Sequence, residues 1–232
     1  MITLRKADER GHARFGWLDS WHSFSFGQYH DPEHMGWGPL RVINDDRVAP
    51  GAGFSPHAHR DMEIISYVLD GALEHKDSSG AGSVIRPGEV QLMSAGRGIT
   101  HSEYNPSPRE GVHFLQIWIE PAQRGTPSGY QQHAFPLHER RGRLRILVAP
   151  DGRDGALRIG QDVLVQAALL DGGETIDYTL AAGRRAYVHL ARGQMKLNDQ
   201  IMRSGDGAKI GDESLLCFRD GQGAEFLLFD LP

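Results

Sequence analysis

A His-x-His pair at His57 and His59, followed about 40 residues later by His101 and Glu103, constrains this chain more than any other feature. Side chains two residues apart on a β-strand lie on the same face. Two strands could therefore direct four ligand atoms at one point, and three imidazoles with one carboxylate suit a divalent transition metal such as Fe, Mn, Co, Ni, Cu or Zn. Either pair alone is weak, because 12 histidines in 232 residues are expected to give about one His-x-His pair by chance. Together the two pairs predict a metal site.

Composition excludes several classes of protein. Hydrophobic residues make up 39% of the chain and charged residues 24%, as is usual in soluble globular proteins, and the net charge of −5 offers no basic surface for nucleic acid or an anionic membrane. The N-terminal residues 1–10 contain no apolar signal segment, and the longest apolar runs are too short to span a bilayer. Cys217 is the only cysteine, which excludes an internal disulfide and a thiolate-cluster metal site. We therefore expect a cytoplasmic protein, a monomer, without a nucleic-acid or membrane partner.

The spacing of glycine and proline predicts an all-β chain. The 29 glycines and 12 prolines separate short apolar segments at frequent intervals, a pattern typical of many short strands joined by turns. The polar segment 121–143 is the best linker candidate and has room for short helical turns, but no long amphipathic helix is expected. Strands are expected at residues 20–30 (strand and turn), 40–44, 62–69, 83–86, 90–93, 112–119, 144–148, 162–170, 186–190 and 225–229.

Glycine spacing also indicates an internal repeat. Two glycines 20 residues apart bracket the His pair, and another two with the same separation occur 122 residues later. In that register the four candidate ligands align with Thr179, Ala181, Ala224 and Phe226. The second half is therefore expected to repeat the fold of the first without its ligands, which predicts one metal per chain.

These motifs resemble those of the cupins, and most closely those of one cupin family, the pirins. The segments that carry the resemblance are FSF at 24–26, GPLRVIND at 38–45, HAHR at 57–60, AGRGITHSE at 95–103 and QIW at 116–118. They cover nearly all of residues 17–120, whereas residues 135–232 have no comparable motif. Two positions depart from the pirin pattern, Ala58 in place of Pro and Asp61 in place of Gly, and neither is a ligand position.

The resemblance implies a bicupin fold of two tandem cupin β-barrels, a metal-binding domain at 1–132 and a cupin-like domain without ligands at 133–232. It implies His57, His59, His101 and Glu103 as ligands, and it leaves out Glu63, which would be a ligand in many other cupins. One divalent metal is expected, with Fe(II) the first choice and Zn, Mn, Co, Ni and Cu as alternatives.

The activity implied by the resemblance is that of quercetin 2,3-dioxygenase. A flavonol would bind the metal through its deprotonated 3-hydroxyl, Glu103 would accept the proton as general base, and O2 would open the central ring with release of carbon monoxide. The alternatives are a regulatory or redox-sensing pirin that acts through a protein partner, and a cupin isomerase or different dioxygenase.

Several other polar and aromatic residues have less specific interpretations. Glu63 could orient a ligand imidazole or be a core carboxylate paired with a base such as Arg97. His113 lies in an apolar run and is expected to be a satisfied core histidine. Loop, packing or core positions, with room for one tryptophan in a cavity wall, are expected for His22, His30, His34, Trp17, Trp21, Trp37 and Trp118.

Overall fold

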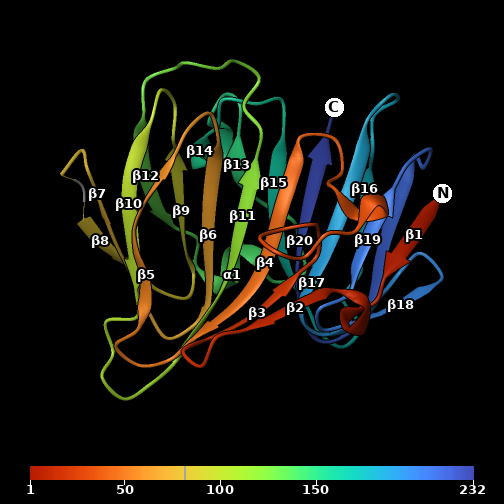
Figure 1. Ribbon diagram of the computed structural model, residues 1–232. Coiled ribbons are helices and arrows are strands. Elements are labelled where there is room, and N and C mark those ends of the chain that lie inside the picture. Colours follow the sequence, from red (N-terminus) through yellow and green to blue (C-terminus); the bar gives the residue numbers. More distant parts are fainter. Residues whose placement is uncertain (81) are drawn as a thin grey trace. The chain divides into compact units, whose positions relative to one another are not determined.

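Short strands joined by turns make up most of the chain in the computed structural model, which describes residues 1–80 and 82–232 (Figure 1). This confirms the all-β prediction. Helical structure within the described residues is limited to α1 (Leu137–Arg140) and the 3₁₀ helices η1 (Ala7–Glu9), η2 (Pro32–His34) and η3 (Arg153–Gly155). None of the helices in this described part is long and apolar enough to cross a membrane.

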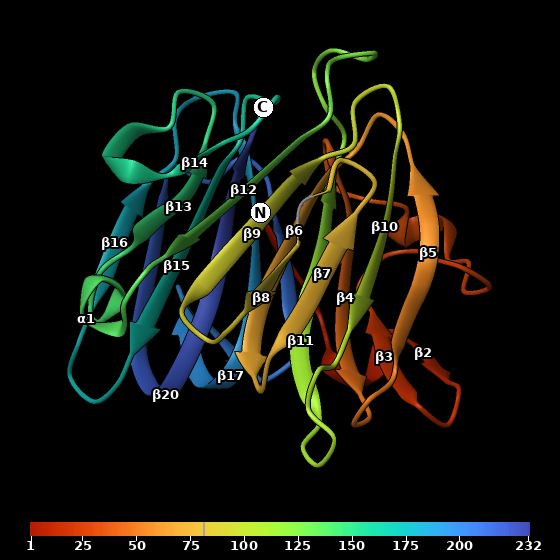
Figure 2. The same cartoon turned by 90° about the vertical axis from the view of Figure 1, so that its left-hand side faces the viewer.

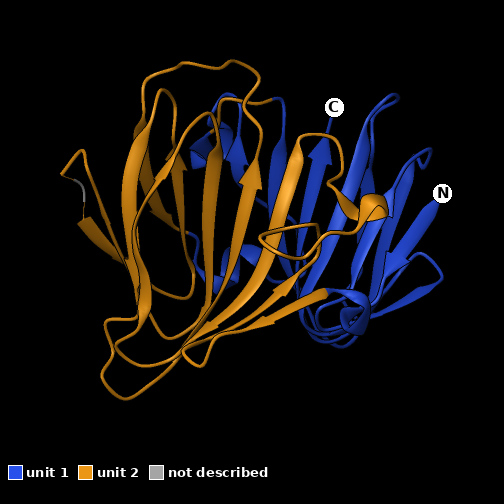
Figure 3. Cartoon of the chain, viewed as in Figure 1, with its two compact units in different colours: residues 1–10, 135–158, 162–232 blue, residues 11–134, 159–161 orange. Residues whose placement is uncertain are grey.

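The chain divides into two units, coloured blue and orange in Figure 3. Unit 2 comprises Gly11–Ala134 and Ile159–Gln161, and unit 1 comprises Met1–Arg10, Phe135–Arg158 and Asp162–Pro232. These units differ from the predicted domains 1–132 and 133–232 mainly in the first ten residues. Those residues belong with the C-terminal strands because β1 (Ile2–Arg5) forms an antiparallel ladder with β19 (Gly207–Ile210).

Unit 2 consists of two antiparallel sheets. The seven-stranded sheet has the order β12-β9-β6-β11-β4-β3-β2, and the four-stranded sheet has the order β5-β10-β7-β8, whose strands lie side by side in Figure 2. The first sheet contains β2 (Gly11–Arg14), β3 (Leu18–His22), β4 (Leu40–Val48), β6 (Glu63–Asp70), β9 (Glu89–Ser94), β11 (Val112–Ile119) and β12 (Gly129–Ala134). The second contains β5 (Gly53–His59), β7 (Leu73–Asp77), β8 (Gly82–Ile85) and β10 (Ile99–Tyr104).

Unit 1 has one nine-stranded sheet with the main order β1-β19-β17-β20-β15-β13-β14, while β16 pairs with β20 and β18 with β17. Its other strands are β13 (Arg145–Ala149), β14 (Leu157–Arg158), β15 (Leu164–Leu170), β16 (Ile176–Thr179), β17 (Arg185–Leu197), β18 (Gln200–Arg203) and β20 (Leu215–Leu231). Apolar side chains fill its interior, and the rings of Phe218 and Phe226 stack there with centroids 4.6 Å apart. Unit 1 thus has an apolar core, whereas the interior of unit 2 contains polar side chains.

The two units repeat one topology. The order β12-β9-β6-β11-β4-β3 in unit 2 corresponds strand by strand to β1-β19-β17-β20-β15-β13 in unit 1. The outermost strands differ, because β2 pairs antiparallel with β3 and β14 pairs parallel with β13. The long strand β17 spans the positions of both β6 and β7, and β20 spans those of both β10 and β11. Accordingly β16 pairs with β20 as β5 pairs with β10, and β18 pairs with β17 as β8 pairs with β7. The duplication predicted from glycine spacing is therefore present in the pairing of the strands.

The predicted alignment of the second ligand pair is wrong. His57 lies opposite His101 in the ladder of β5 and β10, and Thr179 lies opposite Leu215 in the equivalent ladder of β16 and β20. Ala224 and Phe226 instead pair with β15, in the part of β20 that corresponds to β11. A fused strand cannot be recognised from glycine spacing, because β20 has no turn where β10 and β11 are separated.

The segment predicted to be a linker, 121–143, contains β12 and α1. β12 has the polar sequence GYQQHA and lies at the edge of its sheet, where β9 is its one partner among the described strands. An edge strand is held by backbone hydrogen bonds and needs no apolar run, so hydrophobic patterning missed it. The expected strand at 112–119 coincides with β11.

Candidate metal centre and cavity

Three of the four predicted ligands form one cluster in unit 2. β5 carries His57 and His59, and the neighbouring antiparallel strand β10 carries His101 directly opposite His57. The ring centroids are 4.5 Å apart for His57 and His101, 4.8 Å for His57 and His59, and 4.9 Å for His59 and His101. One ligand nitrogen from each ring lies within 4.8 Å of the other two. The two-residue period of the strands thus produces the predicted cluster.

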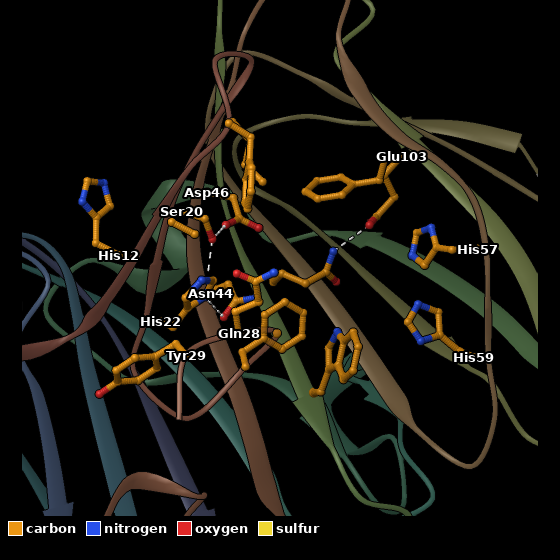
Figure 4. Close-up of a pocket in the computed structure, with 18 residues that line it drawn as sticks. His12, Ser20, His22, Gln28, Tyr29, Asn44, Asp46, His57, His59 and Glu103 are labelled. Carbon is orange, nitrogen blue, oxygen red and sulfur yellow. Dashed lines mark hydrogen bonds between the residues drawn. The ribbon is translucent and has the colours of Figure 1, made fainter. Parts of the chain in front are cut away.

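Glu103 lies on β10 two residues after His101, and the register with β5 shifts between them because β5 has one extra residue there. It is 1% exposed, and one of its carboxylate oxygens lies within 4.8 Å of ligand atoms of His101 and of another buried histidine, His75. Ser66 Oγ donates to Glu103 Oε1 (3.1 Å), and Gln116 Nε2 donates to Glu103 Oε2 (2.6 Å). Glu103 also lines the same cavity as His57 and His59 (Figure 4).

One buried nitrogen makes the donor set suitable for a metal. His101 is 2% exposed, and its Nε2 atom has no hydrogen-bond partner in the described structure. A buried polar atom left unpaired costs about 1–3 kcal/mol, and coordination would remove that cost. His57 Nδ1 lies 2.9 Å from Ser55 O, to which it donates, so that His57 Nε2 keeps its lone pair for a ligand bond. The residues present therefore fit a transition-metal ion.

Burial favours the neutral, metal-binding form of His59 and His101. Burial, together with the neighbouring His57, lowers the pKa of His59 to about 4, and burial with the neighbouring imidazoles lowers the pKa of His101 to about 3. Burial raises the pKa of Glu103 to about 7, although the hydrogen bonds from Ser66 and Gln116 act in the opposite direction. A bound cation would favour the ionised carboxylate, because it replaces the solvation that burial removes.

The candidate metal cluster opens into a cavity of about 470 Å³. Its aromatic and apolar lining consists of Phe15, Leu18, Phe26, Tyr29, Phe54 and Trp118. Figure 4 shows His57, His59 and Glu103 at one end and Ser20, His22, Asn44 and Asp46 at the other. A cavity with aromatic walls and polar groups at both ends can hold a flat molecule that carries hydroxyl groups on several rings.

The polar end opposite the metal cluster is built by strands β3 and β4. The register places Ser20 opposite Asp46 and His22 opposite Asn44, so all four side chains share a face. Asn44 Oδ1 lies 2.8 Å from His22 Nδ1, and Ser20 Oγ donates to Asp46. Burial raises the pKa of Asp46 to about 7. This group is not predicted from the sequence, which suggests a loop or packing role for His22; the available signal is the two-residue spacing of these polar residues on each strand.

Glu63 lies outside both candidate metal clusters found among the described residues. The left-handed backbone of Asp61 (φ 48°) follows β5, and Glu63 then begins β6 in the other sheet. Its carboxylate accepts hydrogen bonds from Ser94 Oγ (2.7 Å) and from the backbone of Gly160, and in the described structure no ion pair joins it to Arg97. That left-handed conformation favours glycine, so Asp61 stands at a position where glycine would be less strained.

Two of the less specific interpretations are confirmed. His113 is satisfied by Asp45, whose Oδ1 lies 2.6 Å from His113 Nε2. Trp118 is the tryptophan in the cavity wall, where its ring meets that of His59 edge-on with centroids 4.9 Å apart.

Comparisons with known proteins agree with this geometry. The family model named Pirin matches residues 3–119, and the model named Quercetinase C-terminal cupin domain matches residues 146–231. The chain is 46% identical to a quercetin 2,3-dioxygenase of Escherichia coli K12, with coverage of 100% of this chain and 99% of the relative. It is 45% identical to a putative quercetin 2,3-dioxygenase of Pseudomonas aeruginosa, with full coverage of both.

Solved structures give the same result. The crystal structure of YhhW from Escherichia coli matches with a TM-score of 0.97 and 46% identity, covering 100% of this chain and 98% of that one. The crystal structure of bacterial pirin YhhW in complex with nickel(II) matches with a TM-score of 0.95 and 46% identity, covering 100% and 99%.

Proposed function

The chain belongs to the pirin family, and from this premise we propose that it is a metal-dependent dioxygenase that cleaves flavonols such as quercetin with O2 and releases carbon monoxide. The observation that carries the proposal is the cluster of three imidazoles at one end of an aromatic-walled cavity. A purely structural metal site would be closed by its protein ligands, whereas this cluster faces a space that a small molecule can enter.

The metal would be held by His57, His59, His101 and Glu103. The unpartnered Nε2 atom of His101 and the position of Glu103 beside it support this ligand set. We place Fe(II) first, and Zn, Mn, Co, Ni and Cu remain candidates because ligand type alone does not select among them. When bound, a divalent metal would lower the pKa of a coordinated hydroxyl group, and a redox-active one, which excludes Zn, would also supply the redox chemistry needed for O2.

The cavity suits a three-ring polyphenol. Its volume of about 470 Å³ lies within the range of about 300–1,000 Å³ that small-molecule sites occupy. Phe26 and Trp118 contact each other edge-on with ring centroids 5.3 Å apart, and they offer apolar surface to a flat ligand. The polar end formed by Ser20, His22, Asn44 and Asp46 can exchange hydrogen bonds with hydroxyl groups remote from the metal.

Glu103 is the group that would accept the proton of the flavonol 3-hydroxyl. A general base must be ionised before it accepts a proton, and a bound cation would favour the ionised form of Glu103 against the effect of burial, which raises its pKa in the metal-free protein. Hydrogen bonds from Ser66 and Gln116 fix the direction of its carboxylate. The same two donors would stabilise the negative charge of Glu103 before the proton is transferred.

The test is to mix metal-loaded protein anaerobically with quercetin and then to admit oxygen. The proposal predicts a shifted flavonol absorption on mixing and its decay, with carbon monoxide release, once oxygen enters. Tight metal binding with neither a flavonol shift nor oxygen uptake, across Fe, Mn, Co, Ni and Cu, would reject the enzyme and favour a regulatory pirin that acts through a protein partner.

A further inference from the structure

His75 lies directly behind the candidate metal cluster and has no role in the site described so far. It is carried by β7, which pairs with β10 so that His75 faces Glu103 and Asp77 faces His101 in the ladder. The side chains of His75 and Asp77 are both 0% exposed. A buried imidazole and a buried carboxylate, two residues apart on one strand, are therefore in contact with each other and with the metal cluster.

The contacts form a chain of three side chains. Asp77 Oδ2 lies 2.9 Å from His75 Nε2, and His75 Nδ1 lies 3.4 Å from His101 Nδ1. Asp77 is itself held in place, because its Oδ1 atom accepts hydrogen bonds from the backbone N–H and the hydroxyl of Ser79. The ring of Tyr130 packs on His75 with centroids 4.9 Å apart, which restricts rotation of the imidazole.

The positions of the protons follow from this chain. A carboxylate only accepts hydrogen bonds, so His75 Nε2 carries the proton that faces Asp77. His75 Nδ1 then has a lone pair and accepts a hydrogen bond, and the only hydrogen that His101 can offer it is on Nδ1. Gln91 Nε2, another donor, faces the same His75 atom at 3.5 Å. His101 Nε2 is thereby left with its lone pair, and this is the buried nitrogen without a partner.

We propose that Asp77 and His75 position His101 for metal binding by fixing its tautomer and ring orientation, so that the Nε2 lone pair points to the ion. His75 is then a positioning residue and not a ligand. Outer partners of this kind orient ligand imidazoles and raise their basicity in other metal sites. The inference rests on the metal site of the proposed function, but its tautomer pattern also holds in the metal-free protein.

The competing arrangement has His75 as a direct ligand. His75, His101 and Glu103 each offer a ligand atom within 4.8 Å of the others, so an ion could in principle bind there. That arrangement uses the Nδ1 side of His101 and leaves its Nε2 atom buried and unpaired. It would also separate His57 and His59 from the ion, although both line the cavity.

The first experiment is nitrogen NMR of histidine-labelled protein, metal-free and loaded with Zn²⁺. If Asp77 and His75 position His101 in this way, His101 carries its proton on Nδ1 in both forms, and its Nε2 atom becomes zinc-bound. His75 then stays protonated at Nε2, with a zinc-free Nδ1. A zinc-bound His75 nitrogen, or a proton on His101 Nε2 in the metal-free protein, would overturn the proposal.

The second experiment measures Ni²⁺ affinity by competition with a chelator for His75→Gln and Asp77→Asn. Both variants are expected to bind Ni²⁺ about 10–100-fold more weakly than the parent protein. The matched controls are His113→Gln and Asp45→Asn, which break another His–Asp pair of unit 2 with a 2.6 Å contact and are expected to keep the parent affinity. Equal losses of Ni²⁺ affinity in the variants of both His–Asp pairs, or no loss in His75→Gln, would refute the positioning role of His75 and Asp77.

The two experiments also separate this inference from the proposed function. A parent protein that binds no Ni²⁺ would reject the metal site. The tautomers of His75 and His101 in the metal-free protein would still test whether the Asp77–His75 pair positions His101. The NMR measurement needs no variant, so a failure of Asp77→Asn to fold would not remove the test.

Discussion

His57 and His101 lie directly opposite each other on adjacent antiparallel strands, with ring centroids 4.5 Å apart. This pairing turns two short sequence motifs into one cluster, because His59 follows on the same face of β5. The two residues are separated by 44 positions in the chain, so only the register of β5 and β10 brings them together. The register is therefore as important to the site as the residues themselves.

Replacement of a cluster histidine should remove the metal. One metal per chain is expected in the parent protein, since the ladder of β16 and β20 in unit 1, which corresponds to that of β5 and β10, contains no histidine. His101→Ala should lower metal affinity by more than about 100-fold, beyond the range typical of outer-shell partners. Elemental analysis checks both expectations, with His113→Ala as the control that keeps its metal. Two metals per chain, or full occupancy in His101→Ala, would contradict the account.

The two buried glutamates should behave differently. Glu103→Gln is expected to lower turnover by about 10²–10⁴-fold, the usual contribution of a general base, and to weaken metal binding. Glu63→Gln should keep the metal, because Glu63 faces Ser94 and Gly160 instead of the cavity. Metal analysis and steady-state kinetics of both variants provide the check. If Glu63 proved essential for binding and Glu103 dispensable, the ligand set of other cupins would apply here.

Asp46 should make the stability of the metal-free protein depend on pH. Burial raises its pKa from 3.8 to about 7, so the folded state keeps a proton that the unfolded state releases between these values. Stability from this group is therefore lost as pH rises from about 4 to about 7. The Asp46→Asn variant has no carboxyl group to ionise at this position. The difference between its free energy of unfolding and that of the parent should therefore shift in favour of the variant by roughly 2–4 kcal/mol as pH rises over that range. Urea denaturation at several pH values measures the difference.

The comparison of Asp46→Asn with the parent also removes an opposing effect. The lowered pKa values of His59 and His101 stabilise the folded state as pH rises from about 4 to about 6.5, and this contribution is common to both proteins. A difference in stability that stays constant with pH would show that Asp46 is ionised normally.

Trp118 should contribute to flavonol binding and not to metal binding. Its ring lines the cavity beside His59 and Phe26. Loss of an aromatic contact worth about 0.5–1.5 kcal/mol should raise the Kd for quercetin by about 2–10-fold in Trp118→Ala, and Trp118→Phe should restore most of the affinity. Anaerobic absorption titration gives the Kd, and metal analysis gives the control. Unchanged quercetin affinity in the alanine variant would place the flavonol elsewhere.

The gathering of His57, His59 and His101 in one place could be predicted from the sequence because their spacing is local. His-x-His and His-x-Glu each need only the two-residue period of a strand, and the resemblance to pirins supplied the pairing of the two segments. The contacts of His75 and Ser20 depend instead on which strands become neighbours, β7 with β10 and β3 with β4. A His-x-Asp or Ser-x-His pair is visible in the sequence, but nothing local indicates that it faces the cluster or the cavity.

The pairing of the first strand, β1, also cannot be predicted from local sequence. Ile2–Arg5 pairs with Gly207–Ile210, about 200 residues away, in the place that β12 occupies in unit 2. Neither segment has an apolar run that distinguishes one sheet edge from the other, so the sequence favours pairing with the nearer strands. Long-range edge pairing is determined by the complete sheet and is not recorded in local patterns.

The most direct test of the central claim is the amount of carbon monoxide released for each quercetin consumed by the metal-loaded protein. Simultaneous absorption and carbon monoxide measurements after oxygen is admitted give this ratio, and His101→Ala serves as the inactive control. A flavonol dioxygenase at this site is expected to release one carbon monoxide for each quercetin in the parent protein and none above background in the variant. Quercetin decay without carbon monoxide, or equal release from both proteins, would contradict a flavonol dioxygenase at this site.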